Sequence, residues 1–287
     1  KARELDRIGL STYVFTGSFE VPSPFLTHSV RADIILIDKV IGVKVALADD
    51  KYPNLSREEL AKLAGQLLLA ASISGKGAVM HCHTGRNARG LRQVFDLLEA
   101  VNLPITQILP THINRRLPDI LEDGIKFAKM GGTIDFSAVM SRRSGSTNAY
   151  DPDQAVRKAL DAGIPLRQIT LSSDCNVSMP VLNLQDQPVG LHATSPGILH
   201  REWRHILRTN KLELADALPL VTSNVARVLK LDDRKGALKP GMDADIVLLD
   251  DALGVDTVFC RGKLMVKEAK PVVKELFEDY DPRDVAF

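Results

Sequence analysis

The sequence predicts an α/β protein in which β-strands alternate with α-helices along most of its 287 residues. Short runs rich in β-branched residues recur along the chain, and each is bounded by turn residues. A longer stretch with helical periodicity follows each run. Strands that alternate with helices form right-handed βαβ units, so we expect a parallel sheet that is buried on both faces.

The predicted elements follow in order. We expect strands at Ser11–Thr16, Ile41–Leu47, Ala78–His83, Gln107–His112, Thr133–Ser137 and Gln168–Ser173. We expect helices at residues 28–40, 56–74, 88–101, 117–130, 151–162 and 198–209. Ser56 with Glu59 is typical of a capping box, and Asp151 followed by proline is typical of a helix start. Gly131 and Gly163 stand where helices should end.

The number of units decides between two architectures. Six βα units are present, whereas a closed (β/α)₈ barrel needs eight. An open doubly wound sheet could hold six, but the Gly-rich phosphate turn typical of that fold is absent from the sequence. Residues 1–10 look like the end of an amphipathic helix and lack an initiator Met. We therefore expect residues 1–235 to form a TIM-type barrel that lacks its first strands.

The composition changes after residue 235. Short strands joined by Gly-containing turns are expected at Ala244–Leu249, Val255–Cys260 and Lys263–Val266. This segment is too short to be a complete domain. Residues 236–287 are therefore expected to be the C-terminal part of a small β-sandwich-like domain whose partner strands lie before the barrel.

Composition excludes several classes of function. The chain has 37 Lys+Arg against 36 Asp+Glu, so it lacks the basic excess that draws a protein to nucleic acid or anionic membranes. Its longest apolar run, Leu67 to Ile73, is far short of the roughly 18 residues of a membrane span. Three widely separated cysteines offer no disulfide framework and indicate a reducing compartment, which predicts a cytoplasmic location.

Candidate site residues come from the C-terminal ends of the strands, where barrel enzymes build their active sites. Alternation along the second strand sends Lys44 to the face opposite Val43 and Val45, which is the inside of a barrel. A neutral amine there can react with CO₂ to form a carbamate, whose two oxygens can bind metals. The alternatives are a lysine that reaches the strand end or one that pairs with a carboxylate.

Two further strands end in histidines. His81 and His83 share one face of the third strand, and His83 lies nearer its C-terminal end, so it is the better metal ligand. His81 is one layer deeper and could be a spare ligand, a group that supports the ligands, or a hydrogen-bonded core histidine. His112 ends the fourth strand, and Arg115 follows it as either a surface charge or a fork for a substrate carboxylate.

The sixth strand ends at Asp174, which places a carboxylate at the same rim. Asp174 could instead cap the following turn, and Ser178 could be an ordinary loop residue. The order Lys, His, His, Asp along the strands, all at C-terminal ends, is much more specific than any one of these signals. Further along, residues 176–196 are rich in Pro, Gly and polar residues, and we expect them to form a loop over the site.

At this point the sequence resembles the isoaspartyl (β-aspartyl) dipeptidases of the amidohydrolase superfamily. The segments that carry the resemblance are Thr16 to Ser23, Ile41 to Lys44, His83 to Gly85, Leu109 to Arg115, Gly131 to Asp135, Leu171 to Asp174, Lys239 to Leu248 and Arg261 to Val266.

The resemblance implies a two-zinc hydrolase that cleaves isoaspartyl dipeptides by means of a hydroxide bridging the metals. Lys44 would be carbamylated and bridge both ions, and His83 and His112 would hold the second ion. Asp174 would bind the first ion and shuttle a proton. Arg115 and Ser178 match positions that bind the carboxylate groups of the dipeptide. The resemblance also implies a homo-oligomer.

Three departures from the family pattern keep other functions open. The first-strand His-x-His pair of the family is absent from this chain. Phe19 stands at a tyrosine position and lacks its hydroxyl donor, and Lys51 stands at the position of a substrate-binding arginine. The alternatives are therefore another amidohydrolase, such as a cyclic-amide hydrolase or a deaminase, and an inactive protein with the same fold.

Overall fold

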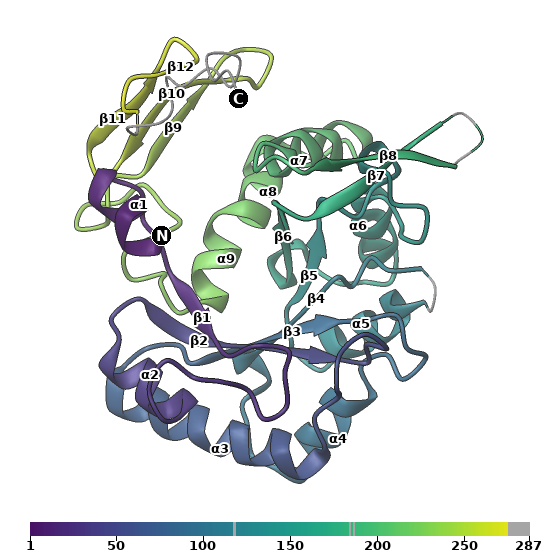
Figure 1. Ribbon diagram of the computed structural model, residues 1–287. Helices are drawn as coiled ribbons and strands as arrows, with labels where there is room; N and C mark the ends of the chain where they lie inside the picture. Colours follow the sequence, from purple (N-terminus) through teal and green to yellow (C-terminus); the bar gives the residue numbers. More distant parts are fainter. Residues whose placement is uncertain (117–118, 184, 186, 275–287) are drawn as a thin grey trace, which may run out of the picture.

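Six parallel strands, each followed by a helix, form the body of the protein (Figure 1). The computed structural model describes residues 1–116, 119–183, 185 and 187–274. β1, β2, β3 and β4 are neighbours in sequence order in one sheet, and β5 pairs with β6 in a second. These six strands match the predicted ones, and their order is that of a TIM-type barrel. Their bounds are Val14–Thr16, Val40–Leu47, Val79–Thr84, Ile108–Thr111, Ile134–Ser137 and Ile169–Ser172.

Each strand of the body is followed by an α-helix, as predicted. Positions 117 and 118 of the fourth predicted helix lie outside the described residues. The capping box at Ser56 is confirmed, because its N–H donates to Glu59 at 2.7 Å and the N–H of Glu59 donates back to its hydroxyl at 3.2 Å. The helices after β1 to β6 are α2 (Val30–Leu36), α3 (Arg57–Ser74), α4 (Arg92–Ala100), α5 (Ile120–Lys129), α6 (Pro152–Asp161) and α7 (Ile198–Thr209).

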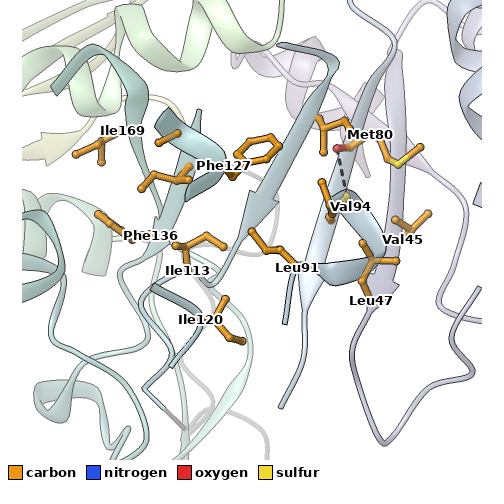
Figure 2. Close-up of a cluster of buried hydrophobic side chains, with 14 of the residues drawn as sticks. Val45, Leu47, Met80, Leu91, Val94, Ile113, Ile120, Phe127, Phe136 and Ile169 are labelled. Atoms are coloured by element: carbon orange, nitrogen blue, oxygen red, sulfur yellow. Dashed lines mark hydrogen bonds between the residues drawn. The ribbon is translucent and has the colours of Figure 1, made fainter. Parts of the chain in front are cut away.

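The hydrophobic core lies between the outer faces of the strands and the helices. Val45 and Leu47 of β2 and Met80 of β3 are buried in it (Figure 2). Leu91 and Val94, at the start of α4, pack into the same cluster. Because side chains alternate along a strand, this packing commits the other residues of β2 and β3 to the inner face.

Shorter elements complete this part of the fold. The short helices α8 (Leu214–Ala217) and α9 (Ser223–Val228) follow α7. Single 3₁₀ turns lie at Ile105–Gln107, Arg142–Ser144, Leu166–Gln168 and Leu218–Val221. In the described part of the chain, every helix is too short or too polar to cross a lipid bilayer.

The prediction of a loop at residues 176–196 is wrong. The antiparallel strands β7 (Ser178–Leu182) and β8 (Pro188–Ala193) form a hairpin that projects from the body (Figure 1). Main-chain pairing joins the two strands, and Met179 of β7 packs against the hydrophobic core. The strong turn composition of the segment therefore hid two short strands.

A separate four-stranded antiparallel sheet follows the helices, in the order β12-β11-β10-β9. The helix α1 (Ala2–Ile8) packs against it, and Lys263 donates a hydrogen bond to the carbonyl of Ile8 at 2.8 Å (Figure 1). The predicted C-terminal strands are thus confirmed, whereas the division into domains at residue 235 stays a prediction, and residues 275–287 of the second domain lie outside the described residues. The bounds are Ile246–Leu249, Val255–Cys260, Lys263–Lys267 and Lys270–Pro271 for β9 to β12.

A buried ion pair fixes α7 to the loop after β5. Glu202 is fully buried on α7, and Arg143 donates to its carboxylate at 2.5 Å. The same guanidinium reaches Asp151 and Asp153 at 3.1 Å each, at the start of α6. One arginine therefore joins three segments, and its removal would leave the buried Glu202 with the 3.3 Å contact of Arg201 as its remaining described ion pair.

We predict that Arg143→Met lowers the free energy of unfolding by about 1–3 kcal/mol, because the buried Glu202 would lose its shorter described ion pair and keep the one with the exposed Arg201 side chain. Arg157→Met is the matched control, since its i,i+4 pair with Asp161 is exposed and should contribute less than about 1 kcal/mol. Chemical denaturation of both variants measures the difference. Equal effects of the two substitutions would contradict the role given to the buried pair.

Candidate active site

Lys44 lies on the inner face of the strands, as predicted. Its neighbours Val43 and Val45 are buried against the helices, and its cross-strand partner in register is His81 of β3. The Lys44 charge is one of the causes that lower the pKa of His81, His83 and His112. The Lys44 charge therefore acts on all three imidazoles, which agrees with a side chain on the inner face.

The two predicted ligand histidines meet at the C-terminal ends of β3 and β4. Nδ1 of His83 lies 2.8 Å from Nε2 of His112, and the two rings are nearly perpendicular. The remaining nitrogen of each ring has its own partner. Nε2 of His83 is 3.0 Å from the Asp49 carboxylate, and Nδ1 of His112 is 2.6 Å from the Ser137 hydroxyl. These outer contacts orient both rings so that the inner nitrogens face each other within hydrogen-bond distance.

Burial keeps both imidazoles neutral. Desolvation is the largest cause that lowers the pKa of His83, and it places the pKa of His112 well below the usual value. The nearby Arg115 and Lys44 charges act in the same direction. A neutral imidazole offers a lone pair, which is the form that binds a metal ion.

Asp49 is a site residue that the sequence analysis missed. It follows β2 directly and is 7% exposed. Gly85 makes its position possible, because a Cβ there would lie 2.3 Å from the Asp49 Cα atom. A carboxylate just after a strand was the signal used for Asp174, and the same criterion would have found Asp49. Ser137, at the end of β5, was missed because the sequence analysis assigned no role to the end of that strand.

Asp174 reaches the site from the second sheet. Its carboxylate is 3.9 Å from Nδ1 of His112 and is partly exposed. Both residues have a left-handed backbone, with φ values of 49° and 64°, respectively. Such conformations are rare for residues other than glycine and occur at turns and functional sites. The predicted proton shuttle and the predicted ligand thus lie side by side although they come from different sheets.

Arg115 is a buried residue rather than a surface charge. It is 8% exposed, and its Nε donates to the carbonyl of Thr84 at 2.8 Å. Desolvation and the nearby Arg86 charge lower its pKa to about 10. Asn114 directly precedes Arg115 and fixes the local turn. Its side-chain amide donates to three carbonyls, those of Ser137, Met140 and Tyr150.

Of the other predicted substrate-binding residues, Phe19 contacts a site histidine, whereas Lys51 and Ser178 are exposed. Phe19 is in the site, because its ring centroid lies 5.1 Å from His83 and 4.7 Å from Tyr52. Phe19 and Lys44 line a common cavity of about 480 Å³. The main chain of Lys51 donates to Asp49 at 2.8 Å, while the residue as a whole is exposed. Ser178 is exposed at the start of the hairpin.

The described residues supply part of the donor set that a metal ion needs. Within the described residues, no group of three or more His, Cys, Asp or Glu side chains is arranged to hold a metal ion. The converging nitrogens of His83 and His112 supply two donors, so a third must be of another kind. Lys44 is the nearby candidate, because a carbamate on its amine would offer oxygens. Two neutral imidazoles and such an oxygen donor suit zinc.

Comparisons with known proteins identify the family of the chain. Residues 7–265 match the model of the amidohydrolase family, and the chain belongs to that family. The β-aspartyl dipeptidase of Fervidobacterium islandicum AW-1, solved in complex with the β-Asp-Leu dipeptide, is 34% identical with a TM-score of 0.83, over 96% of this chain and 71% of that one. The similarity to the β-aspartyl dipeptidases is thus confirmed over nearly the whole chain.

Two curated relatives are more distant or shorter matches. The bovine (Bos taurus) N-acetylglucosamine-6-phosphate deacetylase is 40% identical over 70 residues, which are 24% of this chain and 17% of that protein. Adenine deaminase 3 of Rhizobium meliloti (strain 1021) is 22% identical over 289 residues, with 90% of this chain and 46% of that protein covered. The chain thus spans less than half the length of either curated relative.

His81 gives a prediction for acid stability. Its ring stacks on Phe15 with centroids 5.0 Å apart, and burial lowers its pKa to about 3. The unfolded chain takes up this proton near pH 6.5 and the folded chain only near pH 3, so stability falls as the pH falls between these values. The slope is about 1.4 kcal/mol per pH unit.

We therefore predict that His81→Phe removes about 2–3 kcal/mol of the stability loss between pH 6.5 and 4.5, as measured by urea unfolding at both pH values. His192→Phe, at an exposed histidine, is the control and should leave the pH dependence unchanged. An unaltered pH dependence in His81→Phe would show that the buried imidazole takes up its proton in the folded state.

Proposed function

We propose that this protein is a metal-dependent hydrolase that cleaves the isopeptide bond of β-aspartyl dipeptides. The observation that carries the proposal is the contact of His83 with His112 near the Lys44 charge, at the C-terminal ends of their strands. The 34% identity to a dipeptidase solved with β-Asp-Leu supports the choice of substrate.

His83, His112, Asp174 and a carbamylated Lys44 would together hold the two zinc ions. When bound, the metal pair would activate water and polarise the scissile carbonyl. Formation of the carbamate joins the lysine nitrogen to CO₂ and releases one proton. The low pKa values of both imidazoles support this arrangement, because neither ring needs to lose a proton before it binds metal.

The chain's own residues would bind the dipeptide and move the proton. Arg115 would bind a substrate carboxylate, because its Nε is already used by Thr84 and its terminal nitrogens remain for a planar fork. Asp174 would take the proton of the attacking water and deliver it to the leaving amine nitrogen. Ser178 and Lys51 would contact the substrate from the rim. A homo-oligomeric assembly and a cytoplasmic location stay predictions from the sequence.

A second candidate is another amidohydrolase reaction, such as hydrolysis of a cyclic amide or deamination. Phe19 supports it, because this ring contacts His83 and has no hydroxyl with which to stabilise an oxyanion. The similarity to an adenine deaminase over 90% of the chain also supports it. An inactive protein with this fold is the third possibility.

One set of assays separates the three functions. Purified full-length protein, produced with zinc in the growth medium, is tested with β-Asp-Leu, with a panel of cyclic amides and imides, and with adenine. Turnover of β-Asp-Leu with at least one zinc per chain is expected. Turnover confined to the cyclic amides or adenine would replace the dipeptidase proposal, and less than one zinc per chain without turnover would favour the inactive protein.

We predict that Lys44→Ala abolishes turnover and that small carboxylic acids such as acetate partly restore it, because they replace the carbamate oxygens. Zinc content and initial rates with and without the acid are the measurements. Lys62→Ala, an exposed lysine on α3, is the control and should behave like the wild type. Full zinc content in Lys44→Ala without any rescue would count against a bridging carbamate.

Phe19→Tyr should raise turnover of β-Asp-Leu, because the added hydroxyl lies in the aromatic cluster beside His83 and can donate to the developing oxyanion. A donor of this kind contributes on the order of 10²–10³ in turnover where it is well placed. Steady-state kinetics measure the change. An unchanged rate would assign the oxyanion contact to another group.

A further inference from the structure

Asp135 is a buried carboxylate to which the proposed mechanism gives no role. It lies in β5 with 3% exposure, and all its described side-chain contacts are hydroxyl groups. One oxygen accepts from Thr111 and from Ser172, each at 2.6 Å. The other oxygen accepts from Thr170 at 2.8 Å. Three donors around one carboxylate satisfy its ionised form, which is an acceptor only.

These hydrogen bonds cross the place where the strand ladder is interrupted. β4 belongs to the first sheet and β5 and β6 to the second. In the main chain, the N–H of Ile113 donates to the carbonyl of Asp135 at 3.2 Å. The Asp135 carboxylate adds a side-chain link at the same residue, from Thr111 in β4 to Ser172 in β6.

Both links end next to a proposed site residue. Thr111 directly precedes His112, and Ser172 lies two residues before Asp174. His112 and Asp174 have left-handed backbones, which cost about 1–3 kcal/mol each and persist only where the surroundings hold them. The shared oxygen of Asp135 fixes the two strand ends from which these residues project.

We propose that Asp135 is a positioning residue that sets the separation between His112 and Asp174. This inference rests on the proposed function, because it assigns a purpose to the 3.9 Å approach of the two side chains. Asp135 touches neither of them directly. It acts through Thr111 and Ser172, and so it aligns a metal ligand of one sheet with the proton shuttle of the other.

Burial makes the ionised form of Asp135 less favourable. Burial is the largest cause that raises its pKa to about 6, the nearby Asp174 charge adds to the rise, and the three hydroxyl donors oppose it. A neutral residue of the same shape would be easier to bury. The chain nevertheless has a carboxylate at this position. A carboxylate can accept hydrogen bonds from all three hydroxyl groups at once, and this agrees with a positioning role.

Asp135→Asn tests the proposal, because the amide keeps the shape but replaces one acceptor oxygen with a donor. We expect kcat for β-Asp-Leu to fall on the order of 10–100-fold, as is typical when a hydrogen bond behind a metal ligand is lost. KM should change by less than about threefold, because ground-state binding would be unaffected. The visible spectrum of the cobalt-substituted protein should shift, because the ligand geometry changes.

Two hydroxyl variants serve as matched partners. Ser172→Ala removes a bond to the shared oxygen and should reproduce the fall in kcat, even where Asp135→Asn folds poorly. Thr170→Val removes the bond to the other oxygen and should leave kcat within about threefold of the wild type. Thr111→Ser keeps the hydroxyl and should retain the rate, whereas Thr111→Val should not.

Unchanged kcat and an unchanged cobalt spectrum in Asp135→Asn and Ser172→Ala would overturn the proposal. A loss of thermal stability without a change in kcat would also overturn it, since it would show a purely structural role. If wild-type protein does not hydrolyse β-Asp-Leu, the dipeptidase proposal fails, while the cobalt spectra of the same variants still decide the role of Asp135.

Discussion

The register between β2 and β3 is the constraint on which the site depends. Lys44 pairs with His81, and Ala46 pairs with His83. Because both strands bury their other faces against the helices, a shift of one residue would turn the lysine and the histidines into the helical layer. The packing of Val43, Val45, Met80 and similar residues therefore fixes the chemistry of the inner face as well as the stability of the core.

Much of the fold could be predicted because its signals are local. β-Branched runs mark all six parallel strands, and the capping box at Ser56 marks the start of α3 to the residue. The hairpin at residues 178–193 was missed for a physical reason. β8 is exposed throughout and β7 is only partly buried, so no alternation of buried and exposed residues distinguishes them from a loop. The two segments are strands because they pair with each other, and the periodicity of the sequence gives no sign of this pairing.

In the site too, residues marked by a local sequence pattern could be predicted, whereas residues whose role depends on neighbouring strands could not. His83, His112 and Asp174 were found because they lie at or just after the ends of predicted strands, and Lys44 was found because alternation along its strand placed it on the inner face. The residues that orient them were harder to find. Ser137 and Asp135 come from a neighbouring strand, and their role depends on which strands lie side by side. Asp49 was within reach of the sequence, because it follows β2 as Asp174 follows β6.

The join between β4 and β5 has a consequence for how the protein responds to heat. Main-chain ladders hold each sheet together, whereas side-chain hydrogen bonds supply most of the described polar contacts between the two sheets at the strand ends. Regions with fewer cooperative contacts open at lower free energy than the rest of a domain. Warming should therefore loosen this seam first, so that catalysis would fade while the circular dichroism of the helices is still that of the native protein.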